Sequence, residues 1–244
     1  MTPRNAMVLA AGLGLRMRPI TGDRPKPLVE IAGRAMLDRA LDRLQAFGIE
    51  RVVVNSHYLA DQVEAHLAGR AEPVTENSHE DTLLDTGGGV AKALPRLGGH
   101  AFFVVNADIV WLDGRTPALD RLAAGWRDAD MDALLLVQST VKAFGYRGRG
   151  DFQVDQIGRV RRRAELDVAP YVFTGIQILH PRLFAAAPAA PFSLNVLYDR
   201  AEQAGRLHAL VHDGEWFHIG TPEALAEAEA ELSGRSSTTD LRTR

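Results

Sequence analysis

The stretch Val8-Leu9-Ala10-Ala11-Gly12-Leu13-Gly14-Leu15-Arg16-Met17-Arg18-Pro19 decides how this chain folds, together with Pro25-Lys26-Pro27-Leu28 shortly after it. It has the pattern of a short apolar strand that runs into a loop with two glycines. Glycine lets backbone N–H groups come close to an anion, and arginine and lysine side chains pair with phosphate oxygens. The stretch therefore predicts a loop that binds a polyphosphate. The alternative is a strand and tight turn followed by a solvated basic segment.

Two familiar phosphate-binding loops do not fit this stretch. A dinucleotide-binding fingerprint needs a third glycine where Met17 stands, and it needs a helix where Arg18 and Pro19 follow. A Walker-type loop needs a glycine-lysine-serine or glycine-lysine-threonine sequence, which this stretch lacks at the required distance. The sequence therefore indicates a phosphate loop of a third kind.

The composition is that of an ordinary globular protein, with 46% hydrophobic and 24% charged residues among 244. A net charge of −3 gives no overall attraction to nucleic acid or to an anionic membrane, so we expect neither as a partner. No apolar run approaches the length needed to span a bilayer, and a cytoplasmic protein is the default expectation. The absence of cysteine excludes disulfides, thiolate metal sites and thiol nucleophiles.

The first half of the chain alternates strands and helices, which predicts an α/β fold with a Rossmann-like, mostly parallel sheet covered by helices on both faces. We expect strands at 6–10, 51–55, 73–76 and 101–105, and helices at 36–48, 59–67 and 86–94, the last of them ended by Pro95. The second half adds strands at 132–137, 151–154, 158–162, 171–179, 208–212 and 216–219, and helices at 194–204 and 222–232. It is expected to share the same sheet and to form a lid over its carboxyl edge.

This organisation predicts one domain over residues 1–232, divided into halves at 1–112 and 113–232. The remaining residues, 233–244, are polar and lack periodicity, so we expect a disordered tail there.

Asn106-Ala107-Asp108 ends a strand of apolar residues, which places a carboxylate at the same edge of the sheet as the opening loop. Carboxylate oxygens suit Mg²⁺, which usually takes one or two protein carboxylates together with phosphate oxygens and water. Asp108 is therefore a candidate metal ligand. The alternative is that it only caps the following segment.

Three consecutive glycines, Gly87-Gly88-Gly89, follow Thr86 at the start of a predicted helix. Each costs about 1 kcal/mol relative to alanine in a helix, so the cluster suggests that a flat group such as a nucleobase approaches the backbone. A flexible turn is the alternative. The eight histidines are scattered without ligand spacing, and a basic run at Arg147, Arg149, Arg159 and 161–163 is either a solvated hairpin or a grip on an anionic sugar.

Taken together, these residues resemble the sugar-1-phosphate nucleotidyltransferases over about residues 5–232. The family signature is leucine-alanine-alanine-glycine-x-glycine-x-arginine followed by proline-lysine-proline-leucine, and it stands here at 9–16 and 25–28. Less specific motifs resemble the branch that transfers uridylate to N-acetylmuramic acid 1-phosphate, at 84–89, 106–108, 148–152, 173–176 and 216–222. The resemblance implies a fold of the nucleotidyltransferase and glycosyltransferase-A type. It also implies that residues 1–112 bind the nucleotide and residues 113–232 the sugar.

The resemblance further implies roles for particular residues. The catalytic residues are expected to be Arg16, Lys26 and Asp108, with Lys26 bridging the nucleotide and sugar phosphates and Asp108 binding Mg²⁺. The expected nucleotide-binding residues are Ala10, Ala11, Gly12, Gly14, Leu15, Arg16, Lys26, Asn77, Thr86, Gly87 and Asn106. The expected sugar-binding residues are Asp151, Glu165 and Gly175.

One position departs from the family pattern. The family usually carries aspartate as a second metal ligand in a tryptophan-x-aspartate-x-glycine-threonine motif, and this chain has His218 there. Imidazole is a poor ligand for Mg²⁺ compared with carboxylate. Four outcomes remain open: Asp108 holds the metal alone with water, another oxygen ligand substitutes, a softer ion such as Mn²⁺ is preferred with His218 as a ligand, or activity is lost.

The expected reaction transfers a nucleoside monophosphate from a nucleoside triphosphate to a sugar 1-phosphate, with release of pyrophosphate. The resemblance favours UTP and N-acetylmuramic acid 1-phosphate, which would mean peptidoglycan recycling for the bacterial cell wall. One alternative is a guanylyltransferase acting on mannose- or heptose-1-phosphate. Another, favoured only by His218, is a sugar-nucleotide-binding protein without turnover. The sequence indicates no particular oligomeric state.

Overall fold

The central strand of the fold is β1 (Asn5–Leu9), which leads directly into the glycine loop. The structure is a computed structural model that describes residues 2–240, and residues 235–240 of it by their backbone alone. β1 pairs in parallel with β4 (Arg51–Ser56) and β6 (Phe102–Asn106), and β4 pairs in parallel with β5 (Val74–His79). Ala6, Met7 and Val8 are fully buried because helices cover both faces of this parallel core. The predicted mostly parallel α/β sheet is confirmed.

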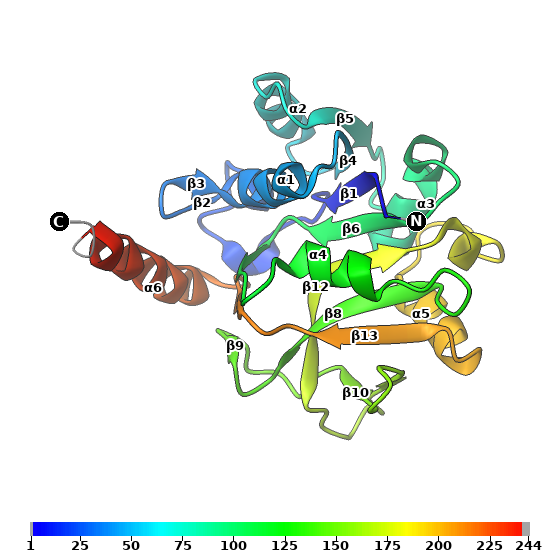
Figure 1. Cartoon of the computed structure of the whole chain (residues 1–244). Helices are drawn as coiled ribbons and strands as arrows, with labels where there is room; N and C mark the ends of the chain where they lie inside the picture. Colours follow the sequence, from blue (N-terminus) through cyan, green and yellow to red (C-terminus); the bar gives the residue numbers. More distant parts are fainter. Residues whose placement is uncertain (1, 241–244) are drawn as a thin grey trace.

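The second half of the chain extends the same sheet to nine strands, chiefly by antiparallel pairing (Figure 1). The strand β12 (Tyr171–Leu179) is antiparallel to both β6 and β8 (Ala133–Ser139), and β13 (Leu207–Val211) is parallel to β8. The outer edge is a hairpin of β10 (Phe152–Val154) and β11 (Val160–Arg162). The expectation that the two halves share one sheet is confirmed.

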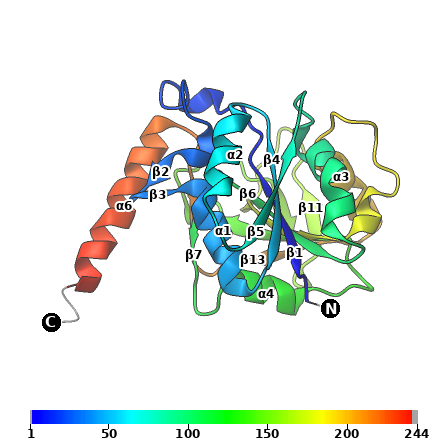
Figure 2. The same ribbon diagram turned by 90° about the horizontal axis from the view of Figure 1, so that it is seen from above.

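Helices cover the two faces of the sheet because each presents one apolar stripe to it. One face is covered by α1 (Met36–Phe47), α2 (Ala60–Ala68) and α4 (Ala118–Gly125). The other face is covered by α3 (Asp85–Leu97), α5 (Asn195–Gln203) and a 3₁₀ turn at Pro181–Phe184. Figure 2 shows α1 and α2 on a different side of the strands from α3.

A third apolar cluster lies beneath the carboxyl edge of the sheet, where it supports the glycine loop. It joins Met17 of that loop to a small sheet of β7 (Ile109–Leu112), β14 (Glu215–His218) and β9 (Ala143–Phe144). The final helix α6 (Pro222–Asp240) contributes Ala228 and Leu232. It runs beside the hairpin of β2 (Glu30–Ile31) and β3 (Arg34–Ala35), as Figures 1 and 2 show, and Glu229 accepts a hydrogen bond from the Ala32 N–H.

Three expectations about the elements are corrected. Pro95 does not end α3, which runs two residues further to Leu97, because a proline near the end of a helix removes only one late hydrogen bond. The strand β14 does not join the main sheet, which the second half was expected to share, since it belongs to the small sheet. Helix α6 continues to Asp240, beyond its expected end at residue 232, because extending a formed helix costs far less than starting one. Residues 241–244 lie outside the described residues.

Among residues 2–240, no helix is both long enough and apolar enough to cross a membrane.

Candidate active site

The glycine loop is held in one conformation by bonds to its own neighbours. Gly14 has φ +64°, and a Cβ added there would lie 3.2 Å from both the Lys26 Cβ and the Thr21 Cγ2 atoms. The Gly14 carbonyl accepts hydrogen bonds from the Thr21 hydroxyl at 2.8 Å and from the Met17 N–H at 2.9 Å. A 3₁₀ turn at Leu15–Met17 follows instead of a long helix, and it leaves Arg16 exposed while Met17 is buried. The exclusion of a dinucleotide-type loop is thus confirmed.

Lys26 and Asp108 form an ion pair next to this loop. The Lys26 Nζ lies 2.7 Å from the Asp108 Oδ2, with the lysine side chain 10% exposed and the aspartate side chain 38% exposed. A 3₁₀ turn at Lys26–Leu28 positions the lysine, and Asp108 follows the end of β6. Removing a charge from water is costly unless a partner compensates it. The pair therefore keeps a nearly buried cation beside a carboxylate that water and ligands reach.

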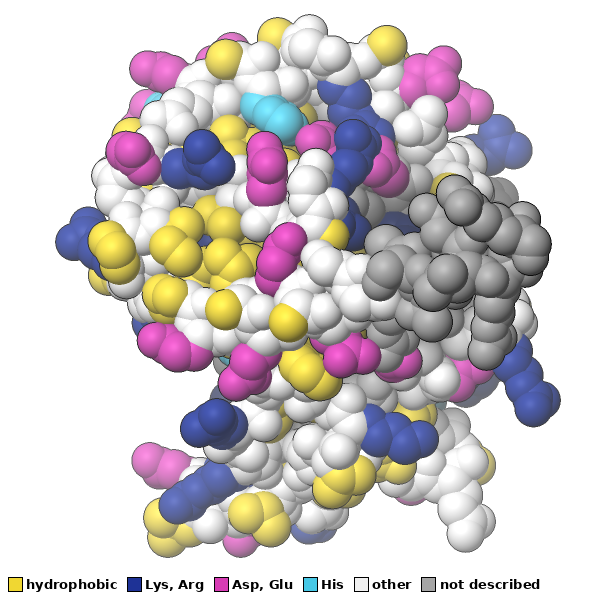
Figure 3. Space-filling model, turned by 90° about the vertical axis from the view of Figure 1, so that its left-hand side faces the viewer, with side chains coloured by type: hydrophobic (Ala, Val, Ile, Leu, Met, Phe, Trp, Pro, Cys, Tyr) yellow, Lys and Arg dark blue, Asp and Glu magenta, His cyan; other side chains and the backbone are white. Residues whose placement is uncertain are grey.

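A cavity of about 330 Å³ opens beside this pair at the carboxyl edge of the parallel strands. Figure 3 faces that edge and shows apolar side chains on the surface among charged side chains of both signs. Seven of the predicted site residues line the cavity: Ala10, Ala11, Gly12, Lys26, Thr86, Asn106 and Asp108. Its volume falls within the range of small-molecule sites, about 300–1,000 Å³.

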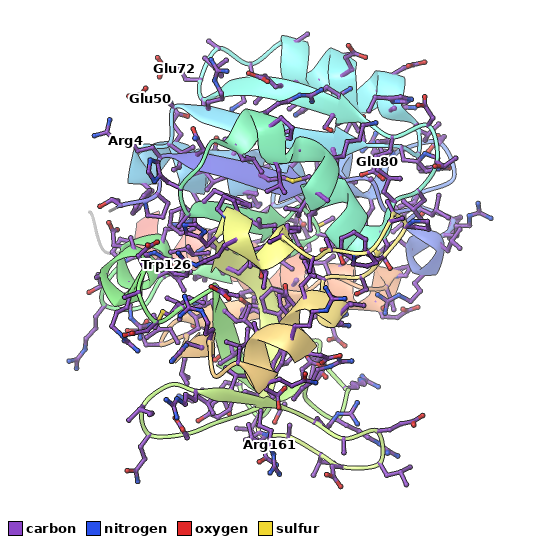
Figure 4. All side chains as sticks on the ribbon, turned by 90° about the vertical axis from the view of Figure 1, so that its right-hand side faces the viewer. Arg4, Glu50, Glu72, Glu80, Trp126 and Arg161 are labelled. Carbon is purple, nitrogen blue, oxygen red and sulfur yellow. The ribbon has the colours of Figure 1, made fainter. Side chains whose placement is uncertain are left out.

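Sequence reasoning missed two buried polar residues in the wall of this cavity, Asn55 and Glu80. The Asn55 Oδ1 accepts a 2.7 Å hydrogen bond from the Ala10 N–H, and its Nδ2 donates to the Glu80 Oε1 at 2.7 Å. The Glu80 Oε2 accepts from the Leu84 N–H at 3.0 Å, and Figure 4 shows Glu80 beside α3. Asn55 ends a valine run, just as Asn106 ends an apolar strand, so the pattern that identified Asn106 could also have identified it.

The glycine cluster at the start of α3 packs closely against other residues of the protein. A Cβ on Gly87 would lie 2.3 Å from the Phe192 ring, and the Gly87 N–H donates to the Phe192 carbonyl at 2.9 Å. A Cβ on Gly89 would lie 2.8 Å from the Glu80 Oε1 and 2.9 Å from the Asn55 Nδ2. The cluster is the first turn of α3 rather than a flexible turn. Close approach by the chain's own side chains therefore requires these glycines.

Two of the predicted nucleotide-binding residues, Gly87 and Asn77, contact other parts of the protein and do not line this cavity. Gly87 is buried against Phe192 and does not line the cavity. Asn77, on β5, uses its side-chain oxygen to accept a 2.7 Å hydrogen bond from the Ser56 hydroxyl, and it is also absent from the lining. Gly14 and Leu15 shape the loop without lining the cavity.

The three predicted sugar-binding residues differ in their burial and in their contacts. The half-buried Asp151 accepts a 2.9 Å hydrogen bond from the Phe173 N–H, which fixes its carboxylate. Gly175 has φ +84° at an irregularity of β12, and a Cβ there would lie 2.9 Å from the Asn106 Nδ2. Gly175 thus makes room for Asn106 in the cavity wall. Glu165 is exposed on a loop.

His218 ends β14, where it pairs with Ile109, the residue that follows Asp108. Its ring packs edge-on against Tyr146 at 6.0 Å and lies 5.7 Å from the Trp216 ring. Burial lowers the pKa of His218 below its ordinary value, Asp108 opposes that effect, and the charges of Lys26 and Arg16 add to it. The imidazole is therefore neutral near pH 7.

The residues around Asp108 fit a metal ion only if the substrate supplies most of its ligands. Within the described residues, no three His, Asp or Glu side chains stand close enough together to hold an ion. Mg²⁺ commonly binds through one or two carboxylates, with water and phosphate oxygens completing its octahedron. Asp108 suits that arrangement, and His218 suits it poorly.

Residues 6–236 match the family model of the MobA-like NTP transferase domain, and the chain belongs to this family. It is 43% identical to the N-acetylmuramate alpha-1-phosphate uridylyltransferase of Caulobacter vibrioides, over 95% of this chain and 98% of the relative. It is 33% identical to the protein of that name from Neisseria meningitidis serogroup B, over 92% of this chain and 96% of the relative. The predicted family resemblance is confirmed.

Solved structures support the fold. A UDP-glucose pyrophosphorylase complexed with UDP-glucose superposes with a TM-score of 0.78 at 15% identity, over 96% of this chain and 99% of that chain. The inositol-1-phosphate CTP transferase from T. maritima superposes with a TM-score of 0.76 at 17% identity, over 95% and 98%. The predicted nucleotidyltransferase fold is therefore confirmed.

Proposed function

We propose that this chain transfers uridylate from UTP to N-acetylmuramic acid 1-phosphate, giving the UDP-sugar and pyrophosphate. The observation that carries the proposal is the Lys26–Asp108 ion pair at the mouth of a nucleotide-sized cavity, directly beside the glycine loop. The choice of substrates rests on the two relatives, whose names specify this reaction. With these substrates the enzyme acts in the reuse of peptidoglycan sugars.

The mechanism needs little acid–base chemistry because the nucleophile is already an anion. A phosphate oxygen of the sugar 1-phosphate attacks the α-phosphorus in line, and the bond from that phosphorus to the bridging oxygen breaks. The main barrier is the repulsion between the two anions, so positioning and charge neutralisation carry the catalysis. Lys26 screens the attacking phosphate from the α-phosphate, while Arg16 and the loop amides neutralise the departing pyrophosphate.

Members of this family typically use Mg²⁺, and we propose that Asp108 is its protein ligand here. When bound, the ion stabilises charge on the phosphate that is transferred. The ion pair with Lys26 implies an exchange of partners on substrate binding, in which Lys26 moves to phosphate and leaves the carboxylate free. Mn²⁺ is the alternative ion because imidazole suits it better than it suits Mg²⁺.

The sugar is proposed to bind between the cavity and β12. Asp151 lies near Tyr146 and His218, since its negative charge raises the pKa of both side chains. Gly175 leaves the space that Asn106 occupies, and Glu165 lies on the adjoining loop. The Asp151 carboxylate is suited to accept hydrogen bonds from sugar hydroxyls.

A substrate panel tests this function directly. The four nucleoside triphosphates are each combined with the 1-phosphates of N-acetylmuramic acid, N-acetylglucosamine, glucose and mannose, and pyrophosphate release is followed with Mg²⁺ or Mn²⁺. We expect UTP with N-acetylmuramic acid 1-phosphate to give the highest kcat/KM. Preference for GTP with mannose 1-phosphate would overturn the substrate assignment. Tight nucleotide binding without release from any pair would make the chain a binding protein.

A further inference from the structure

We infer that Arg147 binds the departing pyrophosphate alongside Arg16, as a second guanidinium at the phosphate end of the site. This inference rests on the proposed nucleotidyl transfer but does not depend on which base or sugar is used. It concerns the basic run of the second half of the chain, to which the reaction otherwise assigns no role.

A second cavity, of about 570 Å³, contains both arginines. Its walls come from the glycine loop, the segment before β10 and the start of α6, and include Arg16, Tyr146, Arg147, His218, Glu223 and Glu227. In the described part of the chain, neither the Arg16 nor the Arg147 side chain makes a hydrogen bond or an ion pair. Two guanidinium groups that share a cavity and lack partners suit an anion with several oxygens, because each can bind it in a bidentate manner.

The two cavities are lined by neighbouring parts of the chain, because Gly12 of the glycine loop lines the first and Arg16 of the same loop lines the second. Lys26 and Asp108 line the first cavity, while Arg16 and His218 line the second. His218 pairs with Ile109, the residue after Asp108, and a Cβ added to Gly220 would lie 2.7 Å from the His218 Nε2 and 3.6 Å from a guanidinium nitrogen of Arg16. The imidazole therefore lies near both Asp108 and Arg16. A nucleotide with its base in the first cavity and its α-phosphate at Lys26 therefore extends its remaining phosphates toward Arg16 and Arg147.

The chemistry requires cations at that end of the substrate. When the sugar phosphate oxygen bonds to the α-phosphorus, the electron pair of the broken bond stays on the bridging oxygen and leaves with the pyrophosphate. Negative charge therefore increases on the leaving group in the transition state. Hydrogen-bond donors held in place near this charge stabilise the transition state more than mobile water does.

The main chain that carries Arg147 is held in place by its neighbours. The Tyr146 ring packs against His218, and the Tyr146 hydroxyl accepts a 3.0 Å hydrogen bond from the Gly150 N–H. A Cβ on Gly145 would lie 3.0 Å from the His218 carbonyl, so this segment runs tightly along the end of β14. Arg147 thus projects from a fixed position beside His218.

The other arginines of the basic run are used elsewhere. Arg163 donates to the carbonyls of Gly150, Ala164, Glu165 and Asp167, and Arg162 pairs with Asp199 at 2.6 Å. Arg159 lines a different cavity, and Figure 4 shows Arg161 at the outer hairpin. Arg149 is exposed and does not line the cavity that contains Arg147, so it is a matched control.

Two acidic side chains of α6, Glu223 and Glu227, line the same cavity as the arginines. Glu223 is exposed and engaged with Thr221 at the start of the helix, while Glu227 is exposed one turn further. A carboxylate near the phosphate path repels a free pyrophosphate and weakens its rebinding. Removing the Glu227 charge should therefore act in the opposite direction to removing the Arg147 charge.

The test is the reverse reaction, in which pyrophosphate and Mg²⁺ cleave the UDP-sugar. Arg147→Ala should raise the KM for pyrophosphate about tenfold or more, and Arg147→Lys should recover part of the loss. The KM for the UDP-sugar should stay within about twofold of the wild-type value. Arg149→Ala should leave both constants unchanged, and Glu227→Gln should lower the KM for pyrophosphate.

Two results would overturn the inference while the proposed function stands. One is an unchanged KM for pyrophosphate in Arg147→Ala. The other is a result in the forward reaction, in which Arg147→Ala raises the KM for N-acetylmuramic acid 1-phosphate but not the KM for N-acetylglucosamine 1-phosphate. Arg147 would then bind the lactyl carboxylate of the sugar. If the wild-type protein releases pyrophosphate from no substrate pair, the proposed function itself fails and this inference fails with it.

Discussion

The Nζ atom of Lys26 lies 2.7 Å from the Oδ2 atom of Asp108, although 81 residues separate the two in the sequence. The lysine comes from the first loop of the fold and the aspartate from the end of β6. Parallel strands bring these two points to one edge of the sheet. The pair is the part of the site on which both substrates are expected to converge.

Lys26→Met should lower kcat by about 10²–10³-fold, because the variant keeps the apolar stem but loses the charge that screens two phosphates. The loss of stability should stay below about 2 kcal/mol, since water reaches Asp108 and screens its unpaired charge. Steady-state kinetics and thermal unfolding measure the two effects. Lys142→Ala removes one positive charge from an exposed position and serves as the control. Turnover near the wild-type rate in Lys26→Met would show that Lys26 does not act in catalysis.

Glu80→Gln should weaken both the fold and the nucleotide cavity. Both carboxylate oxygens accept hydrogen bonds, one from Asn55 and one from the Leu84 N–H, so the amide of glutamine would turn a donor toward a donor. We expect a loss of about 1–3 kcal/mol in the free energy of unfolding, together with a higher KM for the nucleotide. Urea denaturation and initial-rate kinetics measure these changes. Asp81→Asn, at a neighbouring side chain that is 91% exposed, should change neither quantity.

Gly87→Ala should destabilise the protein by about 1–3 kcal/mol, the usual cost of adding an atom to a packed site. The new methyl group would lie 2.3 Å from the Phe192 ring, so the ring or the segment around it must move. Thermal unfolding of Gly87→Ala and of Gly99→Ala makes the comparison, because a Cβ on Gly99 meets no atom within 4 Å. Equal stability of the two variants would show that the glycine cluster is not required for packing.

Stability should fall as the pH drops below about 6.5, the ordinary pKa of histidine. His212 is 3% exposed, and burial lowers its pKa in the folded state. The unfolded chain therefore binds a proton at His212 more readily than the folded chain does. The contribution of His212 to the free energy of unfolding is complete above the pKa of the unfolded state and is lost as the pH falls below it. His212→Gln should reduce the fall in Tm between pH 7.5 and pH 5.5. An identical fall in the variant would assign it to other groups, such as His180 and His208, whose pKa values are also lowered by burial.

His218→Asp should lower the Mg²⁺ concentration needed for half-maximal turnover. The substitution adds a carboxylate beside Asp108, and Mg²⁺ prefers carboxylate to imidazole. Titrations of activity with Mg²⁺ and with Mn²⁺ measure this requirement. The preference for Mg²⁺ over Mn²⁺ should be smaller in the wild-type protein than in His218→Asp. An unchanged requirement for both ions would show that residue 218 lies outside the metal's coordination.

The sequence by itself determined the class of fold and the centre of the site. Apolar runs of strand length that alternate with amphipathic helices specify a parallel sheet, because each element must bury its own apolar side. The glycines and basic residues between 12 and 26 act locally, so their pattern predicted a tight glycine loop without a long helix after it, and the structure contains such a loop. Asp108 was predictable for the same reason, since it directly follows a strand.

Only the tertiary structure decided which distant side chains meet. The approach of Phe192 to Gly87 joins residues 105 positions apart, and no local pattern in the sequence records it. The same holds for the hydrogen bond between Asn55 and Glu80. It holds also for Arg147, which is the residue of its basic run that lines the cavity containing Arg16. Sequence periodicity reports which side of an element is buried, whereas contacts between elements depend on how the elements pack against each other.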